Sequence, residues 1–285
     1  MMIRRKLLMT GAAAAAGTVA GLRVAHAGPA RVRIRHHTVP WRVARPVRLV
    51  HITDIHVGCS TPEAALEAAV QAAHRARPHL TVLTGDYVNS SLHHEKSLSA
   101  FVRALPGPVV ATLGNHDHWA DGPGMHKLLR RAGATVLANQ RLATQPAGVP
   151  LHIVGVDDAR SGHDDVDRAF FRVSQPHDAL VLSHDPASIG SIVQRGGRLV
   201  LSGHTHGGQV QVPGLTDALG RCVGQPHLGG WHEVGAAQLY VNAGLGHSRP
   251  GMRVGPGAAA EVSVLDLVPL SSGRGGEAAA RVSVG

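Results

Sequence analysis

Residues 198–208 read RLVLSGHTHGG, and this stretch carries the pattern on which the fold of the chain depends. The short, continuous apolar run from Leu199 to Leu201 is typical of a strand buried on both faces of a sheet. It leads directly into a glycine-rich turn that contains His204 and His206. Two interpretations are open from this stretch alone: the histidines are polar residues of an ordinary turn, or they bind a metal ion.

The same kind of apolar run recurs along the chain. Further strands are predicted over residues 47–54, 80–86, 109–115, 151–158, 179–185, 238–245 and 261–267. Helical patterns lie between several of them, over residues 62–77, 95–105, 124–132 and 187–195. Strands that alternate with helices predict an α/β fold whose sheets are covered by helices. Because we find no internal repeat and no break in composition, we expect one domain over residues 28–270.

Chemically active side chains occur where five of these strands end. They are Asp54 and His56, Asp86, Asn115 and His116, His184, and His204 and His206. Ligands of open α/β sheets bind beyond the carboxyl ends of the strands, so we expect these side chains to meet at one rim. In each Asp-x-His or His-x-His pair, the two residues would point to the same face if the strand continued through them.

In their order and spacing, five motifs resemble those of the calcineurin-like metallophosphoesterases: DIH (54–56), GD (85–86), GNHD (114–117), SHD (183–185) and GHTH (203–206). The resemblance extends from about residue 47 to residue 267. It implies a two-sheet αββα sandwich with helices on its outer faces. The twin-arginine start of the chain, GHTHGGQ (203–209) and LYVNAGLG (239–246) are similar to an exported or membrane-associated branch of this family.

The resemblance implies a centre of two divalent metal ions: Asp54, His56 and His206 at one ion, Asn115, His184 and His204 at the other, and Asp86 between them. Nitrogen and oxygen ligands of this kind suit Mn, Fe or Zn. The implied reaction is hydrolysis of a phosphodiester or pyrophosphate bond by a hydroxide that bridges the metals. His116 would assist the leaving group, and Asp117 would either orient the imidazole of His116 or cap a helix.

The substrate is the least defined part of this interpretation. A phosphate ester is expected, either an envelope glycolipid or a nucleotide. Candidates for substrate contact are Arg221, His227, Trp231 and His232 in the predicted loop over residues 213–235, together with Arg249. Two other functions stay open: a phosphomonoesterase with the same site, and a cell-envelope protein that binds metal without catalysis.

The start of the chain predicts export. Arg4, Arg5 and Lys6 precede a weakly apolar run and a small-residue pattern at 25–27, as in a twin-arginine (Tat) signal peptide over residues 1–27. The Tat translocase would then be a partner, and the protein would reside in the periplasm or cell envelope, with peripheral membrane contact as an option. The last segment, 271–285, is rich in Gly, Ala and Ser, and we expect a flexible tail.

The formal net charge is +9, with 28 Lys and Arg against 19 Asp and Glu. Arg31, Arg33 and Arg35 alternate with apolar residues, which predicts that they lie on the exposed face of an edge strand. We therefore expect no specific binding of nucleic acid by these arginines. The two cysteines, Cys59 and Cys222, match no zinc or redox spacing, and a disulfide between them is left open.

Overall fold

The computed structural model describes residues 32–58, 61–208, 216, 220, 222, 224–248, 253, 259–270 and 283–284. Several sequence predictions lie outside these residues, namely the signal peptide over 1–27, Arg221, Arg249, Cys59 and most of the tail over 271–285. Cys222 is exposed and carries a free thiol. No helix of the described part is both long and apolar enough to cross a membrane.

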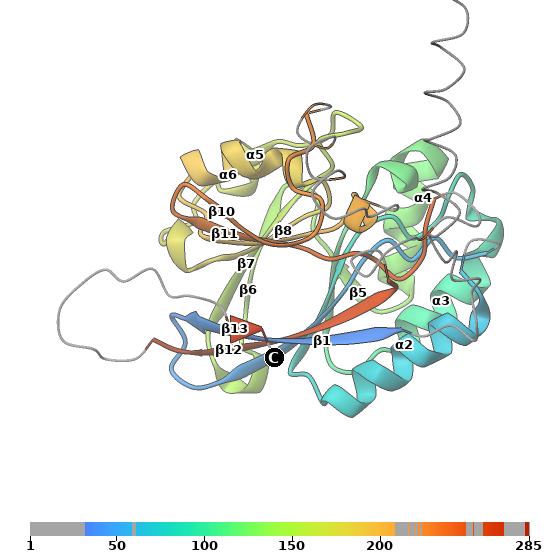
Figure 1. The fold of residues 1–285 in the computed structure, drawn as a ribbon, viewed down its shortest axis with the longest axis horizontal. Helices are drawn as coiled ribbons and strands as arrows, with labels where there is room; N and C mark the ends of the chain where they lie inside the picture. Colours follow the sequence, from blue (N-terminus) through green and yellow to red (C-terminus); the bar gives the residue numbers. More distant parts are fainter. Residues whose placement is uncertain are drawn as a thin grey trace, which may run out of the picture.

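The described strands form two sheets (Figure 1). The first has the order β13 (Ser283–Val284), β1 (Arg33–Trp41), β12 (Glu261–Pro269), β2 (Val47–Ile52), β3 (Leu80–Thr84), β4 (Val109–Thr112) and β5 (Ala134–Val136). The second has the order β10 (Gly230–Val234), β11 (Ala237–Val241), β9 (Leu199–Ser202), β8 (Leu180–Ser183), β7 (Leu151–Val156) and β6 (Gln140–Thr144). Parallel pairing joins β2, β3, β4 and β5 in one sheet and β7, β8, β9 and β11 in the other, so the carboxyl ends of the central strands share one edge.

Helices cover the outer face of each sheet (Figure 1). The first sheet carries α2 (Glu63–Ala76), α3 (Glu95–Ala104) and α4 (Asn115–Arg131), and the second carries α5 (Val166–Ala169) and α6 (Ile189–Gln194). Short 3-10 turns complete the described elements: η1 (Leu92–His94), η2 (Pro146–Gly148), η3 (Pro176–Asp178), η4 (Pro186–Ser188) and η5 (His206–Gly208).

Three apolar clusters separate the four layers. The middle cluster joins the inner faces of the two sheets and includes Leu49, Leu182 and Leu265, all with no exposed surface. One outer cluster packs α2, α3 and α4 on the first sheet, and the other packs α5 and α6 on the second. Strands β3, β8 and β9 are buried along their whole length, which explains why their sequences are mainly apolar and contain no charged residue. The predicted αββα sandwich is confirmed.

The differences from the sequence prediction lie in short or exposed elements. The predicted helix over 124–132 is the second half of α4, which begins at Asn115 and is kinked at Asp121, just before Pro123. The sequence DGPG (121–124) hid the first half, because Pro and Gly are typical of turns. Arg33 is exposed and Arg35 is partly buried at the start of β1. The two-residue strand β13 pairs with β1 at His37 and Thr38, so it covers the edge of β1 only beyond the two arginines.

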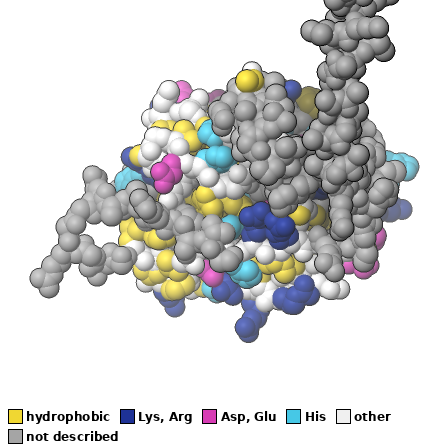
Figure 2. All heavy atoms as spheres, viewed as in Figure 1, with side chains coloured by type: hydrophobic (Ala, Val, Ile, Leu, Met, Phe, Trp, Pro, Cys, Tyr) yellow, Lys and Arg dark blue, Asp and Glu magenta, His cyan; other side chains and the backbone are white. Residues whose placement is uncertain are grey.

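The surface fits the basic composition. Figure 2 shows Lys and Arg side chains at several places on one face, with hydrophobic groups between them and few acidic groups. One arginine of β1 is paired: Arg35 Nε lies 2.8 Å from an oxygen of Glu261, a carboxylate that is only 3% exposed. Part of the positive charge of the protein is therefore paired with a buried carboxylate.

Candidate metal centre

Potential metal ligands converge in two groups where the two sheets meet. Asp54, His56 and His206 form the first group, and in each group all the ligand atoms lie within 4.8 Å of one another. Asp86, His184 and His204 form the second. All are buried except His204, which is partly buried. The structure thus brings together residues that are up to about 150 positions apart, in the division that the sequence resemblance implies.

The ligands follow the strands and do not continue them. Strand β2 ends at Ile52 and β9 ends at Ser202, before each pair begins. The backbone of Asp54, His56, Asp86, His204 and His206 is left-handed, with φ between 46° and 71°. The expectation that strand alternation aligns each pair is therefore wrong. A left-handed non-glycine residue costs roughly 1–2 kcal/mol, so the surrounding structure must hold these turns in place.

Two glycines make room for the ligand carboxylates. A Cβ atom on Gly203 would lie 2.2 Å from Oδ2 of Asp54, and one on Gly114 would lie 2.3 Å from Oδ1 of Asp86. Neither distance is possible for a real side chain. The glycines before His204 and Asn115 are therefore required by the close approach of these two carboxylates.

Asp86 lies between the two groups. Its Oδ2 atom is 3.7 Å from Nε2 of His56 in the first group and 3.2 Å from Nε2 of His184 in the second. Its Oδ1 atom accepts the backbone N–H of His116 at 2.9 Å. Asn115, the first residue of α4, is 1% exposed. One carboxylate therefore contacts both groups.

The residues fit divalent metal ions. Oδ1 of Asn115 and Nδ1 of His204 and of His206 are buried and make no hydrogen bond. Leaving such atoms without a partner is costly, and a cation would supply one. Nδ1 of His184 is 2.7 Å from the carbonyl oxygen of Thr84, which leaves its Nε2 available as a ligand. The donor atoms are oxygen and nitrogen, without sulfur, as at Mn, Fe and Zn sites.

Comparison with known proteins agrees with this geometry. Residues 47–208 match the family of calcineurin-like phosphoesterases. The chain belongs to this family. It is therefore a metal-dependent phosphoesterase, and the resemblance of its sequence motifs is confirmed. The family and the two ligand groups together indicate a dinuclear centre of divalent metal ions.

Three bacterial relatives are informative. The chain is 29% identical over 267 residues to the metallophosphoesterase YkuE of Bacillus subtilis, covering 88% of this chain and 93% of YkuE. It is 28% identical over 278 residues to the phosphodiesterase YaeI of Escherichia coli, covering 94% and 100%. It is 25% identical to the UDP-2,3-diacylglucosamine pyrophosphatase LpxG of Chlamydia trachomatis, over 59% of this chain and 65% of LpxG.

The ionisable side chains of this phosphoesterase site affect one another's pKa. Burial raises the pKa of Asp54 to about 6, and Asp86 acts in the same direction while His184 opposes it. Burial would also raise the pKa of Asp86, but the imidazoles of His184 and His56 outweigh it and hold that pKa well below its usual range. Against the effect of burial, Asp86 raises the pKa of His184. A proton on His184 thus faces Asp86, and a bound cation would take its place.

Asp117 is a structural carboxylate. Its Oδ2 accepts the backbone N–H groups of Asp86 and Gly114 at 2.8 and 2.9 Å, and its Oδ1 accepts that of Tyr87 at 2.8 Å. These bonds tie the turn after β3 to the first turn of α4. The sequence left two roles open for Asp117, to orient the imidazole of His116 or to cap a helix. In the structure its carboxylate caps α4, and the imidazole of His116 contacts the carbonyl of Asn89 instead.

His116 is held at the edge of the centre. Its Nδ1 lies 2.5 Å from the carbonyl oxygen of Asn89, and its ring centroid is 5.0 Å from that of His56. Because a carbonyl only accepts, Nδ1 carries a proton and donates it to Asn89. Nε2 is then the nitrogen that can exchange a proton with a substrate.

The candidate substrate contacts fall in different places. Trp231 lies in β10, where Nε1 donates to Nδ1 of His37 at 3.2 Å and the indole packs on Tyr240, so it belongs to the core and not to the metal centre. The ring of His232 contacts that of His227. His227 lines a hollow of about 210 Å³ together with Asp185 and Thr205, which adjoin the second ligand group.

Two residues near the centre were missed by sequence reasoning. Arg253 donates to the carbonyls of Gly244 and Gly246. The pKa of His206 is held well below its usual value mainly by burial, next by the imidazole of His56, and then by the charge of Arg253. Trp119 is 59% exposed, and its ring contacts that of His116. Trp119 follows His116 by three residues, and this spacing on a helix could have predicted the contact between the two side chains.

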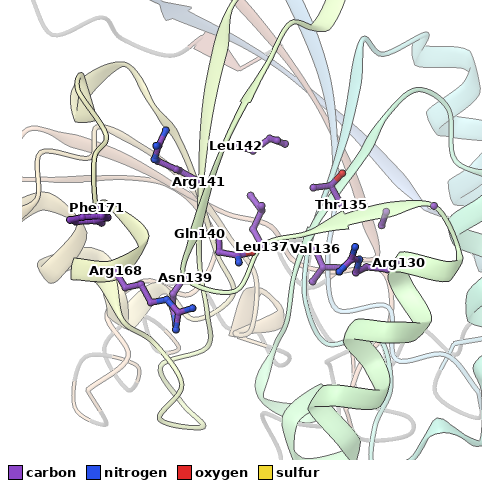
Figure 3. Close-up of a pocket in the computed structure, with 12 residues that line it drawn as sticks. Arg130, Thr135, Val136, Leu137, Asn139, Gln140, Arg141, Leu142, Arg168 and Phe171 are labelled. Carbon is purple, nitrogen blue, oxygen red and sulfur yellow. The ribbon is translucent and has the colours of Figure 1, made fainter.

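A larger cavity lies away from this site. Its volume is about 890 Å³, and it is lined by β5, β6 and neighbouring residues that include Arg130, Arg141, Arg168 and Phe171 (Figure 3). None of its lining residues belongs to either ligand group. We therefore place the active site by its chemistry and not by the size of the hollow.

Loss of either histidine of the GHTH motif is expected to remove a different metal. Purified wild type loaded with Mn should hold about two equivalents by plasma mass spectrometry, and His204→Ala and His206→Ala should each hold about one, because each group loses one of its ligands. His152→Ala, at an exposed position of β7, is the control and should keep both. If both GHTH variants retain two equivalents with unchanged affinity, the assignment of ligands is wrong.

Proposed function

We propose that this phosphoesterase hydrolyses phosphodiester or pyrophosphate bonds at the centre formed by the two ligand groups. The observation that carries the proposal is Asp86, one buried carboxylate in contact with histidines of both groups. Two divalent ions bound there would lower the pKa of a water molecule and offset negative charge on the phosphate oxygens. We further propose that the metals are Mn, Fe or Zn.

The charge of the protein ligands favours an anionic substrate. Asp54 and Asp86 are the carboxylates in the proposed ligand set, and the other ligands are imidazoles and the amide of Asn115. Two carboxylates do not neutralise two divalent ions, so the loaded site keeps a positive charge that attracts a phosphate group. A site with only a structural role has no need of this excess.

His116 supplies the proton chemistry of the proposed reaction. The bond from Nδ1 to the carbonyl of Asn89 fixes the orientation of the ring. A protonated Nε2 can then donate to the oxygen of the leaving group as its bond to phosphorus breaks. The backbone N–H of His116 donates to Asp86 at the same time, which couples the position of the acid to that of the bridging carboxylate.

The relatives support the choice of bond. YaeI is a phosphodiesterase, and LpxG is a pyrophosphatase of UDP-2,3-diacylglucosamine. In both kinds of bond, two oxygens of the attacked phosphate group are linked to a further carbon or phosphorus atom. We propose the same class of substrate for this chain, with a glycolipid or a nucleotide derivative of the cell envelope as its natural form.

We also propose that the enzyme acts after export by the Tat translocase, in the periplasm or cell envelope. The support is the twin arginine at positions 4 and 5, followed by a weakly apolar run. Cell fractionation should find the wild type outside the cytoplasm and an Arg4→Lys/Arg5→Lys variant retained within it. Equal distribution of the two would contradict export by this route.

Removal of the His116 imidazole should slow catalysis without loss of metal. With bis(p-nitrophenyl) phosphate and Mn, His116→Ala is expected to lower kcat by roughly 100-fold or more, the usual contribution of a general acid. His126→Ala, on the same helix but outside the centre, is the matched control and should retain the wild-type rate. Metal content of both variants should equal that of the wild type.

The same assay decides between the open functions. Cleavage of p-nitrophenyl phosphate without cleavage of the diester would indicate a phosphomonoesterase. If metal-loaded wild type cleaves no diester, monoester or UDP-sugar lipid, or if His116→Ala is as fast as wild type, the proposed catalysis is wrong.

A further inference from the structure

Trp119 is a large apolar side chain left in solvent at the edge of the metal centre. It is 59% exposed, whereas Trp41 is 8% exposed and Trp231 is packed against Tyr240. Of the three tryptophans of the chain, Trp119 is therefore the one that offers most of its ring to a ligand.

The position of Trp119 is set by helix α4. Residues three apart on a helix lie on the same face, and His116 and Trp119 have this spacing. Their ring centroids are 5.0 Å apart with an interplanar angle of 63°. The ring of His116 also contacts that of His56, at 5.0 Å and 88°. The imidazole of His116 thus contacts both a histidine of the buried first ligand group and the exposed indole.

The contact between the rings of His116 and Trp119 determines what a leaving group near His116 can reach. An oxygen that receives a proton from His116 lies within hydrogen-bond distance of that imidazole. A substituent of aromatic size on this oxygen extends far enough to reach the neighbouring indole. An exposed indole gains by covering its face with another flat ring, since aromatic pairs are stabilised beyond the effect of buried area.

We propose that Trp119 is a specificity-determining residue that stacks on a planar aromatic leaving group of the substrate. The ring is an aryl group or a nucleobase, which share the flat π face that an indole recognises. This inference rests on the proposed function, because it takes the proton donor to be His116.

The kinetic test compares two methyl phosphodiesters. One has an aryl leaving group, and the other has a fluorinated alkyl leaving group of matched acidity, with products measured by phosphorus NMR. Wild type should favour the aryl ester in kcat/KM by roughly 10-fold, the ratio that one aromatic pair supplies. Trp119→Ala should lose this preference through a lower rate on the aryl ester alone, and Trp119→Phe should keep most of it.

The control is an aromatic residue of similar exposure elsewhere. Phe171 is 64% exposed, and its ring faces the guanidinium of Arg172. Phe171→Ala should leave the preference at its wild-type value. If Trp119→Ala slows both esters equally, Trp119 merely supports His116, and the proposed stacking is overturned. If wild type shows no preference for the aryl ester, it is overturned as well.

A binding experiment gives a readout that does not depend on turnover. p-Nitrobenzylphosphonate, whose carbon–phosphorus bond is not hydrolysed, and uridine monophosphate should quench the tryptophan fluorescence of Mn-loaded wild type. Ribose 5-phosphate, which has no aromatic ring, should not quench. Quenching by one aromatic probe alone would identify its ring class, and equal quenching in Trp119→Phe would overturn the proposal.

The two proposals fail in different ways. If wild type cleaves neither these two esters nor the diester, monoester and UDP-sugar lipid of the assay above, the proposed function is wrong, and the fluorescence titration still decides whether Trp119 binds aromatic phosphates. If wild type and Trp119→Ala each cleave the two esters at equal rates, the hydrolase stands and the role of Trp119 is refuted.

Discussion

The carboxylate of Asp86 is the constraint on which the rest of the structure depends. It is 1% exposed, contacts the imidazoles of His56 and His184 through the same oxygen, and accepts the backbone N–H of His116. A buried carboxylate is stable only when positive charge or hydrogen bonds surround it. The αββα sandwich meets this need by bringing the carboxyl ends of the parallel strands of both sheets to one rim, where strands from both deliver imidazoles around a single acid.

Holding these groups in place requires an unfavourable backbone. Asp54, Asp86 and the histidines after β2 and β9 occupy left-handed conformations that side chains disfavour. Their cost is offset by fixed contacts nearby, of which the bonds from Asp117 to the backbone N–H groups of Asp86 and Gly114 are an example. Similar strain in other proteins is concentrated at functional sites, where the surrounding fold over-determines the geometry.

Much of this could be predicted from the sequence, because each buried strand leaves an apolar run and five of these runs end in candidate ligands. The division of His204 and His206 between two groups followed from the family resemblance and agrees with the structure. Other features left no readable pattern. The left-handed turn at Asp54 looks like a strand in sequence, and the partly buried indole of Trp231 packs against the core although its sequence predicts a loop. The role of Asp117 depends on backbone groups 30 residues away, which spacing along the chain does not reveal.

The most direct test of this account is a crystal structure of Mn-loaded protein with anomalous scattering data at the metal edge. The account predicts two anomalous peaks roughly 3.5–4 Å apart, as in other two-metal sites, with oxygens of Asp86 bound to both. One peak should lie beside Asp54, His56 and His206, and the other beside Asn115, His184 and His204. A single fully occupied peak, or two peaks that do not share Asp86, would contradict the central claim.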